Sequence, residues 1–150
     1  MRKSLLALFL VSLCSVGQWT AKAGGSPMQD GPAKSGEVKI RVGSKSFETT
    51  LVDNESARRL RESFPLTIKM KDLHGNEKYL DLPKALPTNA SVPNAISAGD
   101  VMLYGSNTLV IFYESFQTTY SYTRPGRIND PTELKAALGS GDVTVTIGSE

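Results

Sequence analysis

The chain has 150 residues, of which 39% are hydrophobic and 21% charged, a composition that fits one compact domain and excludes a collagen-like or wholly disordered protein. Its 17 basic and 15 acidic side chains give a formal net charge of +2. Residues 1–23 hold three of the basic side chains and none of the acidic ones, so the remainder carries 14 basic against 15 acidic, a net charge of −1. A nearly neutral domain has no general field for nucleic-acid phosphates or anionic lipid, so nucleic-acid binding is not predicted.

The first 23 residues have the three parts of a cleavable export signal. Residues 1–3 supply positive charge, residues 5–13 are apolar, and residues 21–23 (Ala-Lys-Ala) place small side chains beside a cleavage site. We therefore predict a signal peptide at 1–23, a mature chain that begins at Gly24, and a periplasmic or secreted protein. A membrane anchor is the alternative, but this apolar stretch of nine residues is far shorter than the roughly 20 residues that cross the hydrocarbon core, so no membrane span is predicted.

The only cysteine of the chain, Cys14, allows a further alternative in which the exported protein is lipidated. Residues 11–14 loosely match a lipidation signal, although such signals favour a small residue where Leu13 stands. Simple cleavage is therefore the favoured prediction. It would leave the mature domain without cysteine, and hence without disulfides or thiol chemistry.

Residues 24–36 are rich in glycine, proline and serine and predict a flexible linker, followed by a domain at 37–150. Within this domain, apolar residues alternate with polar ones over short runs that end at glycine-containing turns, as they do in β-hairpins. The predicted elements are a hairpin at 38–42 and 47–51, a helix at 54–63, a hairpin at 66–71 and 79–82, strands at 101–104, 109–113 and 120–124, a second helix, and a strand at 143–147.

Capping signals define the two helices. Residues 53–55 (Asp-Asn-Glu) provide an N-cap for the first helix. Residues 130–133 (Asp-Pro-Thr-Glu) match a capping box with proline at the first helical position, and this second helix is expected to end at Gly139. Two ion pairs with i,i+4 spacing are expected on the solvent face of the first helix: Glu55 with Arg59, and Arg58 with Glu62.

Eight short strands, with one helix after the second strand and one before the eighth, show no alternation of strands and helices. This order predicts a mainly β protein, a closed or nearly closed antiparallel barrel of eight strands with two capping helices.

The stretches NEKYLDLP, AGDVMLYGSNTLVIFYESF and YSYTRPGRI resemble the bacterial cyclophilin-like fold proteins, which are distantly similar to the cyclophilin peptidyl-prolyl isomerases. The resemblance covers residues 37–147 and implies a cyclophilin-like β-barrel. Cyclophilins place a catalytic arginine in a Phe-x-Arg strand that is followed by Gln-Gly-Gly. Residues 66–71 here read LTIKMK, and Gln-Gly-Gly does not occur. Lys69 cannot replace the fixed donor fork of a guanidinium, so no catalytic residue is predicted and a protein without isomerase activity is favoured.

Other residues with catalytic potential stand alone. His74 is the only histidine and falls in a predicted turn, so neither a histidine-based metal site nor a Ser-His-Asp triad is expected. Asp100 could serve as a general base, but a carboxylate beside Gly99 is more typical of a turn acceptor for backbone N–H groups. No glycine-rich phosphate loop precedes a helix, and no cofactor is predicted.

The best candidate for ligand recognition is the strand at 120–124. Tyr120, Tyr122 and Arg124 alternate with other residues and are expected to share one strand face, followed by Arg127 and accompanied by Tyr79. Aromatic rings and guanidinium groups provide contact area, hydrogen bonds and stacking at low entropic cost. The alternative is that these side chains pack as part of the barrel wall.

These observations favour an exported, non-catalytic binding module that holds an extended peptide or a small ligand in the cell envelope. A divergent prolyl isomerase is the enzyme alternative. The resemblance also implies a third possibility, an accessory domain in redox metabolism, because similar domains are sometimes joined to flavodoxin-like ones. The oligomeric state is left open.

Overall fold

The computed structural model describes residues 37–149, so the predicted signal peptide and linker lie outside the described residues. Within this range, neither helix has the length and hydropathy that a membrane span requires. The elements are β1 (Glu37–Val42), β2 (Lys45–Leu51), α1 (Glu55–Arg61), β3 (Leu66–Leu73), β4 (Glu77–Asp81), β5 (Ala95–Ile96), β6 (Asp100–Tyr104), β7 (Thr108–Phe112), β8 (Phe116–Gln117), β9 (Tyr122–Ile128), α2 (Leu134–Leu138) and β10 (Val143–Gly148).

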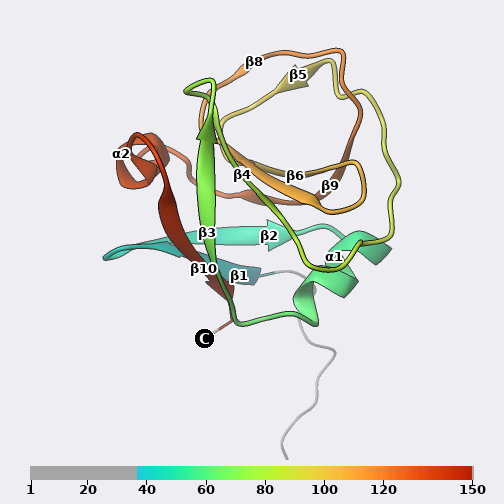
Figure 1. Cartoon of the computed structure of the whole chain (residues 1–150), viewed down its shortest axis with the longest axis horizontal. Helices are drawn as coiled ribbons and strands as arrows, with labels where there is room; N and C mark the ends of the chain where they lie inside the picture. The colour runs from blue at the N-terminus through green and yellow to red at the C-terminus, as the bar shows by residue number, and fades with distance from the viewer. Residues whose placement is uncertain (1–36, 150) are drawn as a thin grey trace, which may run out of the picture. The chain divides into compact units, whose positions relative to one another are not determined.

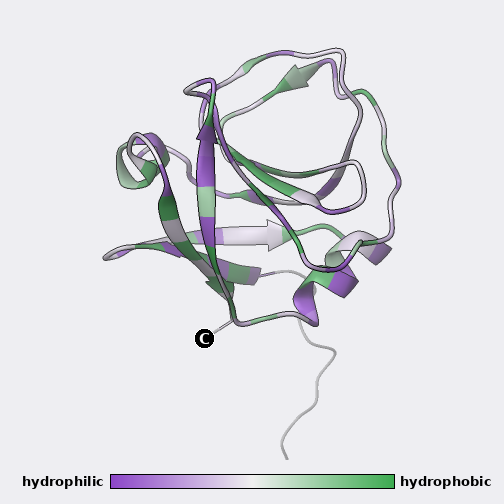
Figure 2. Ribbon diagram, in the orientation of Figure 1, coloured by the Kyte–Doolittle hydropathy of each residue, from purple (hydrophilic) through white to green (hydrophobic). Residues whose placement is uncertain are grey.

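Eight of these strands form the predicted closed antiparallel barrel, in the order β1-β10-β3-β4-β7-β6-β9-β2 (Figure 1). The sheet can close around an apolar interior because successive side chains along a strand point to opposite faces. Along β3, Ile68 and Met70 are buried while Lys69 and Lys71 are exposed, and Figure 2 shows this change of hydropathy from residue to residue. Closure pairs the strands on both sides, so the barrel has no free edge.

The main hydrophobic core fills the barrel and includes both helices. Leu60 of α1 and Leu138 of α2 are almost completely buried in the same cluster as Ile40, Leu103 and Val145 from the strands. Each helix therefore contributes apolar side chains to the interior, and the predicted eight-stranded barrel with two helices is confirmed.

A second hydrophobic cluster lies outside the barrel interior. It consists of Ile96, Met102, Val110, Phe112 and Tyr122, with Tyr79 and Phe116 packed against it. Two of these residues belong to a small two-stranded sheet of β5 and β8, which the sequence analysis had treated as connecting chain. Strands of two residues are too short to produce a period of two, so only the paired structure reveals them.

The N-cap predicted for α1 is confirmed. The side-chain oxygen of Asn54 accepts a hydrogen bond from the backbone N–H of Ala57 at 2.8 Å. The amide nitrogen of the same side chain donates to the carbonyl of Arg124 in β9 at 2.9 Å. Asn54 therefore both starts the helix and ties it to a barrel strand.

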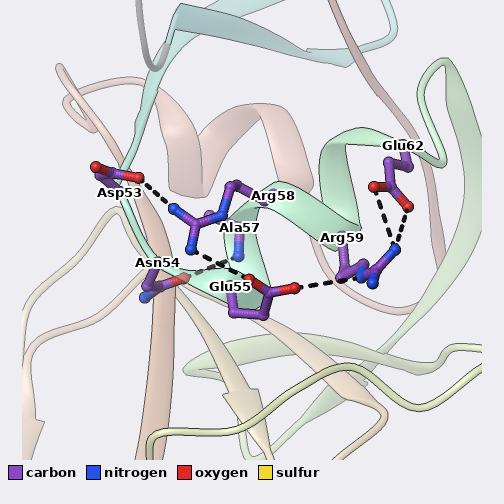
Figure 3. A network of polar contacts seen from close by, with 7 residues as sticks. All are labelled: Asp53, Asn54, Glu55, Ala57, Arg58, Arg59 and Glu62. Carbon is purple, nitrogen blue, oxygen red and sulfur yellow. Dashed lines mark hydrogen bonds and ion pairs between the residues drawn. The ribbon is translucent and has the colours of Figure 1, made fainter.

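The ion pairs on α1 differ in part from those predicted (Figure 3). Arg59 contacts Glu55 at 3.4 Å, as expected for the i,i+4 pair. Arg58 instead contacts Asp53 at 2.6 Å and Glu55 at 3.1 Å, and Glu62 is paired with Arg59 at 3.2 Å. The predicted pair of Arg58 with Glu62 is wrong because two carboxylates on the N-terminal side of Arg58 take its guanidinium group.

The predicted capping box of α2 is also wrong. The carboxylate of Asp130 accepts hydrogen bonds from both the backbone N–H and the hydroxyl of Thr132, at 3.0 and 2.6 Å, and so forms a local turn before the helix. Pro131 lies in this turn and not at the first helical position. Glu133 precedes the helix without a side-chain cap, and its carboxylate contacts Lys45 at 2.5 Å. The predicted end at Gly139 is confirmed, with a φ of 60° there.

Candidate functional site

A groove of about 460 Å³ lies over β4, β6 and β7, on the face of these strands that carries the second hydrophobic cluster. The segment from β8 to the start of β9 forms one of its sides. We call it the tyrosine groove, because four of its lining residues are tyrosines. The lining residues are Leu73, His74, Asn76, Glu77, Tyr79, Asp81, Tyr104, Thr108, Val110, Phe116, Tyr120 and Tyr122.

Aromatic rings in edge-to-face and tilted contact line the tyrosine groove and pack against the buried ring of Phe112. Phe112, which is fully buried, contacts Phe116 and Tyr122 with ring centroids 5.5 and 5.6 Å apart. Tyr104 contacts Tyr122 at 5.7 Å and Tyr120 at 6.1 Å. Tyr104 and Tyr120 remain 47% and 62% exposed, so two large rings are held in place yet face solvent.

The polar part of the groove lining includes two acidic residues, Glu77 and Asp81, together with His74, Asn76 and Thr108. Glu77 is half-buried, and burial raises the pKa of its carboxyl above the usual value. Burial also raises the pKa of Tyr122, with a further contribution from the nearby charge of Glu77. Asp81 accepts a hydrogen bond from the hydroxyl of Thr108 at 2.6 Å. His74, with a φ of 54°, occupies the predicted turn between β3 and β4.

The five residues predicted from the sequence divide into two groups. Tyr79, Tyr120 and Tyr122 line the tyrosine groove, whereas Arg124 and Arg127 contact the carboxylate of Asp100.

The single recognition face expected from alternation is interrupted in two ways. Tyr120 precedes β9, which begins at Tyr122. The pairing of β6 with β9 then shifts register: Leu103 is opposite Thr123, but Val101 is opposite Gly126, so two residues of β9 oppose one residue of β6. Such a bulge breaks the period of two and separates Arg124 from the tyrosines.

Asp100 is the centre of the second group. Its side chain is 1% exposed, and one oxygen accepts hydrogen bonds from the backbone N–H of Ser97 at 2.9 Å and from Arg124 at 3.3 Å. The other oxygen lies 3.6 Å from a guanidinium nitrogen of Arg127. The predicted role as an acceptor for a turn N–H is confirmed, and two arginines compensate the buried charge.

A buried lysine forms a third polar centre, which the sequence analysis did not identify. The Lys78 ammonium, with a side chain that is 0% exposed, contacts Asp72 at 2.7 Å and the carbonyls of Gly139 and Gly141 at 2.8 and 2.6 Å. The hydroxyl of Tyr113 donates to the same oxygen of Asp72 at 2.6 Å. The hydrogen bonds from Lys78 and Tyr113 lower the pKa of Asp72 to about 2. Burial and the bond to Asp72 raise the pKa of Tyr113.

The geometry around Lys78 is that of a structural bridge. All three donors of the ammonium have acceptors, and two of those acceptors belong to the loop between α2 and β10. The bridge therefore fastens this loop to β3 and β4.

Tyr104 is the exposed aromatic residue of the groove that was not predicted from the sequence. Tyr104 is the direct cross-strand partner of Tyr122, a pairing that joins residues 18 positions apart and leaves no local signal. Lys69, the residue weighed as a substitute for the catalytic arginine, is 71% exposed, contacts Asp142 at 3.4 Å and does not line the groove. Within residues 37–149, no group of three or more His, Asp or Glu side chains is placed to hold a metal ion.

Comparisons with known proteins agree with this architecture. The sequence matches the Cyclophilin-like family over residues 40–148. No curated protein matches it. Its structure is similar to the solution structure of the hypothetical protein AF2241 from Archaeoglobus fulgidus, with a TM-score of 0.58 and 18% sequence identity over 77% of this chain and 95% of that chain. The structural likeness concerns the fold alone, whereas the match over residues 40–148 means that the chain belongs to the cyclophilin-like family.

Proposed function

We propose that this protein is an exported binding module that holds an extended peptide or a small ligand in the tyrosine groove without acting on it chemically. The observation that carries the proposal is the pair of exposed rings, Tyr104 and Tyr120, supported from below by buried aromatic residues. Clustered, pre-positioned aromatic side chains on a surface are typical of recognition sites, because they lose little conformational entropy when a ligand covers them.

The ligand is placed among the tyrosines and not beside the arginines. Arg124 and Arg127 are already engaged with Asp100, and a ligand would have to compete with that buried carboxylate. The three lining residues predicted from the sequence, Tyr79, Tyr120 and Tyr122, remain in the proposal, and the structure adds Tyr104.

The binding role predicts a large effect of Tyr120→Ala on affinity and almost none on stability. Tyr120 is 62% exposed and precedes β9, so truncation should leave the melting temperature within about 1 °C of wild type. A central contact residue should weaken binding roughly thirtyfold, which corresponds to about 2 kcal/mol. The measurement is an NMR titration of ¹⁵N-labelled protein with acetylated, amidated tripeptides that carry acidic, basic, apolar or prolyl side chains.

The control for this titration is Val92→Ala, which truncates another exposed apolar side chain that is not part of the groove lining. Its affinity should equal that of wild type. Amide shifts that map away from β4, β6 and β7, or wild-type affinity of Tyr120→Ala, would contradict the proposal. The prolyl tripeptide also separates the enzyme alternative: accelerated cis–trans exchange that Lys69→Ala abolishes would favour a divergent isomerase.

Export is the second part of the proposal and rests on residues 1–23. Protein recovered from the cell envelope should have an intact mass that corresponds to a chain beginning at Gly24. It should also lack tryptophan fluorescence, because the only tryptophan of the chain, Trp19, is removed with the signal. A chain that begins at a lipidated Cys14 would indicate the lipoprotein alternative, and a full-length cytoplasmic species would refute export.

A further inference from the structure

The carboxylates around the tyrosine groove differ in whether they have partners. Asp72 is bound by Lys78, Asp81 by a threonine hydroxyl, and Asp100 by two arginines. Glu77 is the exception: within residues 37–149 its carboxylate makes no hydrogen bond or ion pair in the structure. This acidic group thus has no ion-pair partner. His74, the basic residue of the groove lining, forms no ion pair with it, and the charge of His74 only partly offsets the effect of burial on the pKa of Glu77.

The surroundings of Glu77 disfavour an ionised carboxylate that has no ion-pair partner. Its backbone is paired with Phe112 on β7 and Leu73 on β3, so the side chain leaves the sheet beside apolar neighbours and is half-buried. Burial raises the pKa of its carboxyl, and its charge contributes to the raised pKa of Tyr122. A carboxylate that is partly removed from water and lies next to aromatic rings is stabilised when a cation approaches it.

The other lining residues favour a cation as well. No lysine or arginine of the described chain belongs to the groove lining, whereas tyrosine rings dominate it. The faces of aromatic rings attract ammonium and guanidinium groups, and guanidinium stacks on them best. Lys71, which lies opposite Tyr79 on β3, lines an adjoining hollow of about 200 Å³ that shares Tyr79 and Asp81 with the groove, and Lys71 itself is not part of the groove lining.

The spacing of the two acidic residues indicates an elongated occupant. Glu77 and Asp81 lie four residues apart on β4, on the same strand face as Tyr79, so about 13 Å of groove separates their backbone positions. This is the length of about four residues of an extended peptide.

We propose that the tyrosine groove binds an extended peptide segment through a cationic side chain, arginine or lysine, whose charged group contacts Glu77 and whose stem or plane packs on the tyrosine rings. This inference rests on the proposed binding function and specifies the chemistry of the ligand. The feature that selects this occupant is charge complementarity between its cationic side chain and the groove, whose lining has an unpartnered carboxylate and no lysine or arginine.

The experiment compares three probes in NMR titrations of the ¹⁵N-labelled protein at pH 7 and low salt. The first is acetyl-Gly-Gly-Arg-Gly-Gly-amide, the second has citrulline, an uncharged isostere, in place of arginine, and the third is ethylguanidinium. The arginine peptide should bind about tenfold more tightly than the citrulline peptide. Ethylguanidinium should bind at least about tenfold more weakly than the arginine peptide, because it lacks the extended backbone.

Two charge-neutralising variants test the role of Glu77. Glu77→Gln should bind the arginine and citrulline peptides equally, while its melting temperature stays at or above that of wild type, since an unpartnered carboxylate is removed. Lys71→Gln, a neutralisation of opposite sign on the adjacent strand, should retain the preference for arginine.

Each failure has a distinct meaning. Equal affinity for the arginine and citrulline peptides, with amide shifts in the groove, would overturn the cationic specificity and leave the binding function standing. Ethylguanidinium that binds as tightly as the arginine peptide would overturn the peptide and identify a free cation as the ligand class. If no probe, and none of the tripeptides used above, shifts groove resonances, the binding function itself is wrong.

Discussion

Replacing Lys78 with methionine is expected to lower the free energy of unfolding by about 3 kcal/mol and the melting temperature by roughly 10 °C. The substitution removes the ammonium that bridges Asp72 to the carbonyls of Gly139 and Gly141, and it leaves these acceptors without their donor inside the folded domain. Urea unfolding and thermal circular dichroism measure the two quantities.

Lys69→Met is the matched control for this substitution. Lys69 is 71% exposed and forms one surface ion pair, so its replacement should change stability by less than about 0.5 kcal/mol. Equal stability of the Lys78 and Lys69 variants would show that water replaces the buried bridge without cost.

The same bridge predicts a pH dependence of stability. The pKa of Asp72 is lowered to about 2 in the folded protein, below the value near 4 of an unfolded chain. The unfolded state therefore binds the proton first, and the stabilisation from ionised Asp72 is complete above pH 4 and is lost as the pH falls toward 2. The drop in melting temperature between pH 5 and pH 2.5 should be smaller in Lys78→Met than in wild type, and an equal drop would contradict this assignment.

Tyr122→Ala is expected to lower the free energy of unfolding by about 3 kcal/mol, because Tyr122 is only 8% exposed and its ring contacts both Phe112 and Tyr104. Tyr122→Phe keeps the ring and should remain within about 1 kcal/mol of wild type. Chemical unfolding of the two variants measures the difference.

The comparison with Tyr120→Ala decides what the two tyrosines do. Tyr120→Ala should keep wild-type stability and lose affinity, whereas Tyr122→Ala should lose stability whether or not ligand is present. If Tyr122→Ala were as stable as wild type, the second hydrophobic cluster would not depend on its central ring, and the support of the groove by buried aromatic residues would be refuted.

Much of the fold could be predicted because its determinants are local. The hairpin of β1 and β2 shows a period of two on both sides of a tight turn, and Asn54 starts α1 with a side chain that reaches only three residues ahead. The capping box of α2 was predicted wrongly, although its determinants are also local, because two local hydrogen-bond patterns compete for the same side chain. Asp130 could accept from the third or the second residue after it, and the structure has the second, Thr132, so the capping box does not form.

The amino-acid sequence by itself thus determined the order of the barrel strands along the chain, the antiparallel barrel, the two helices, and three of the residues that line the groove, because periodicity, turns and caps act within a few residues of each other. The tertiary structure alone decided which side chains meet. The bulge between β6 and β9 separates Arg124 from the tyrosines, and the pairing of β6 with β9 brings Tyr104 against Tyr122. Burial of Lys78 requires carbonyl groups more than 60 residues away, and such partners exist only after long-range strand pairing has closed the barrel.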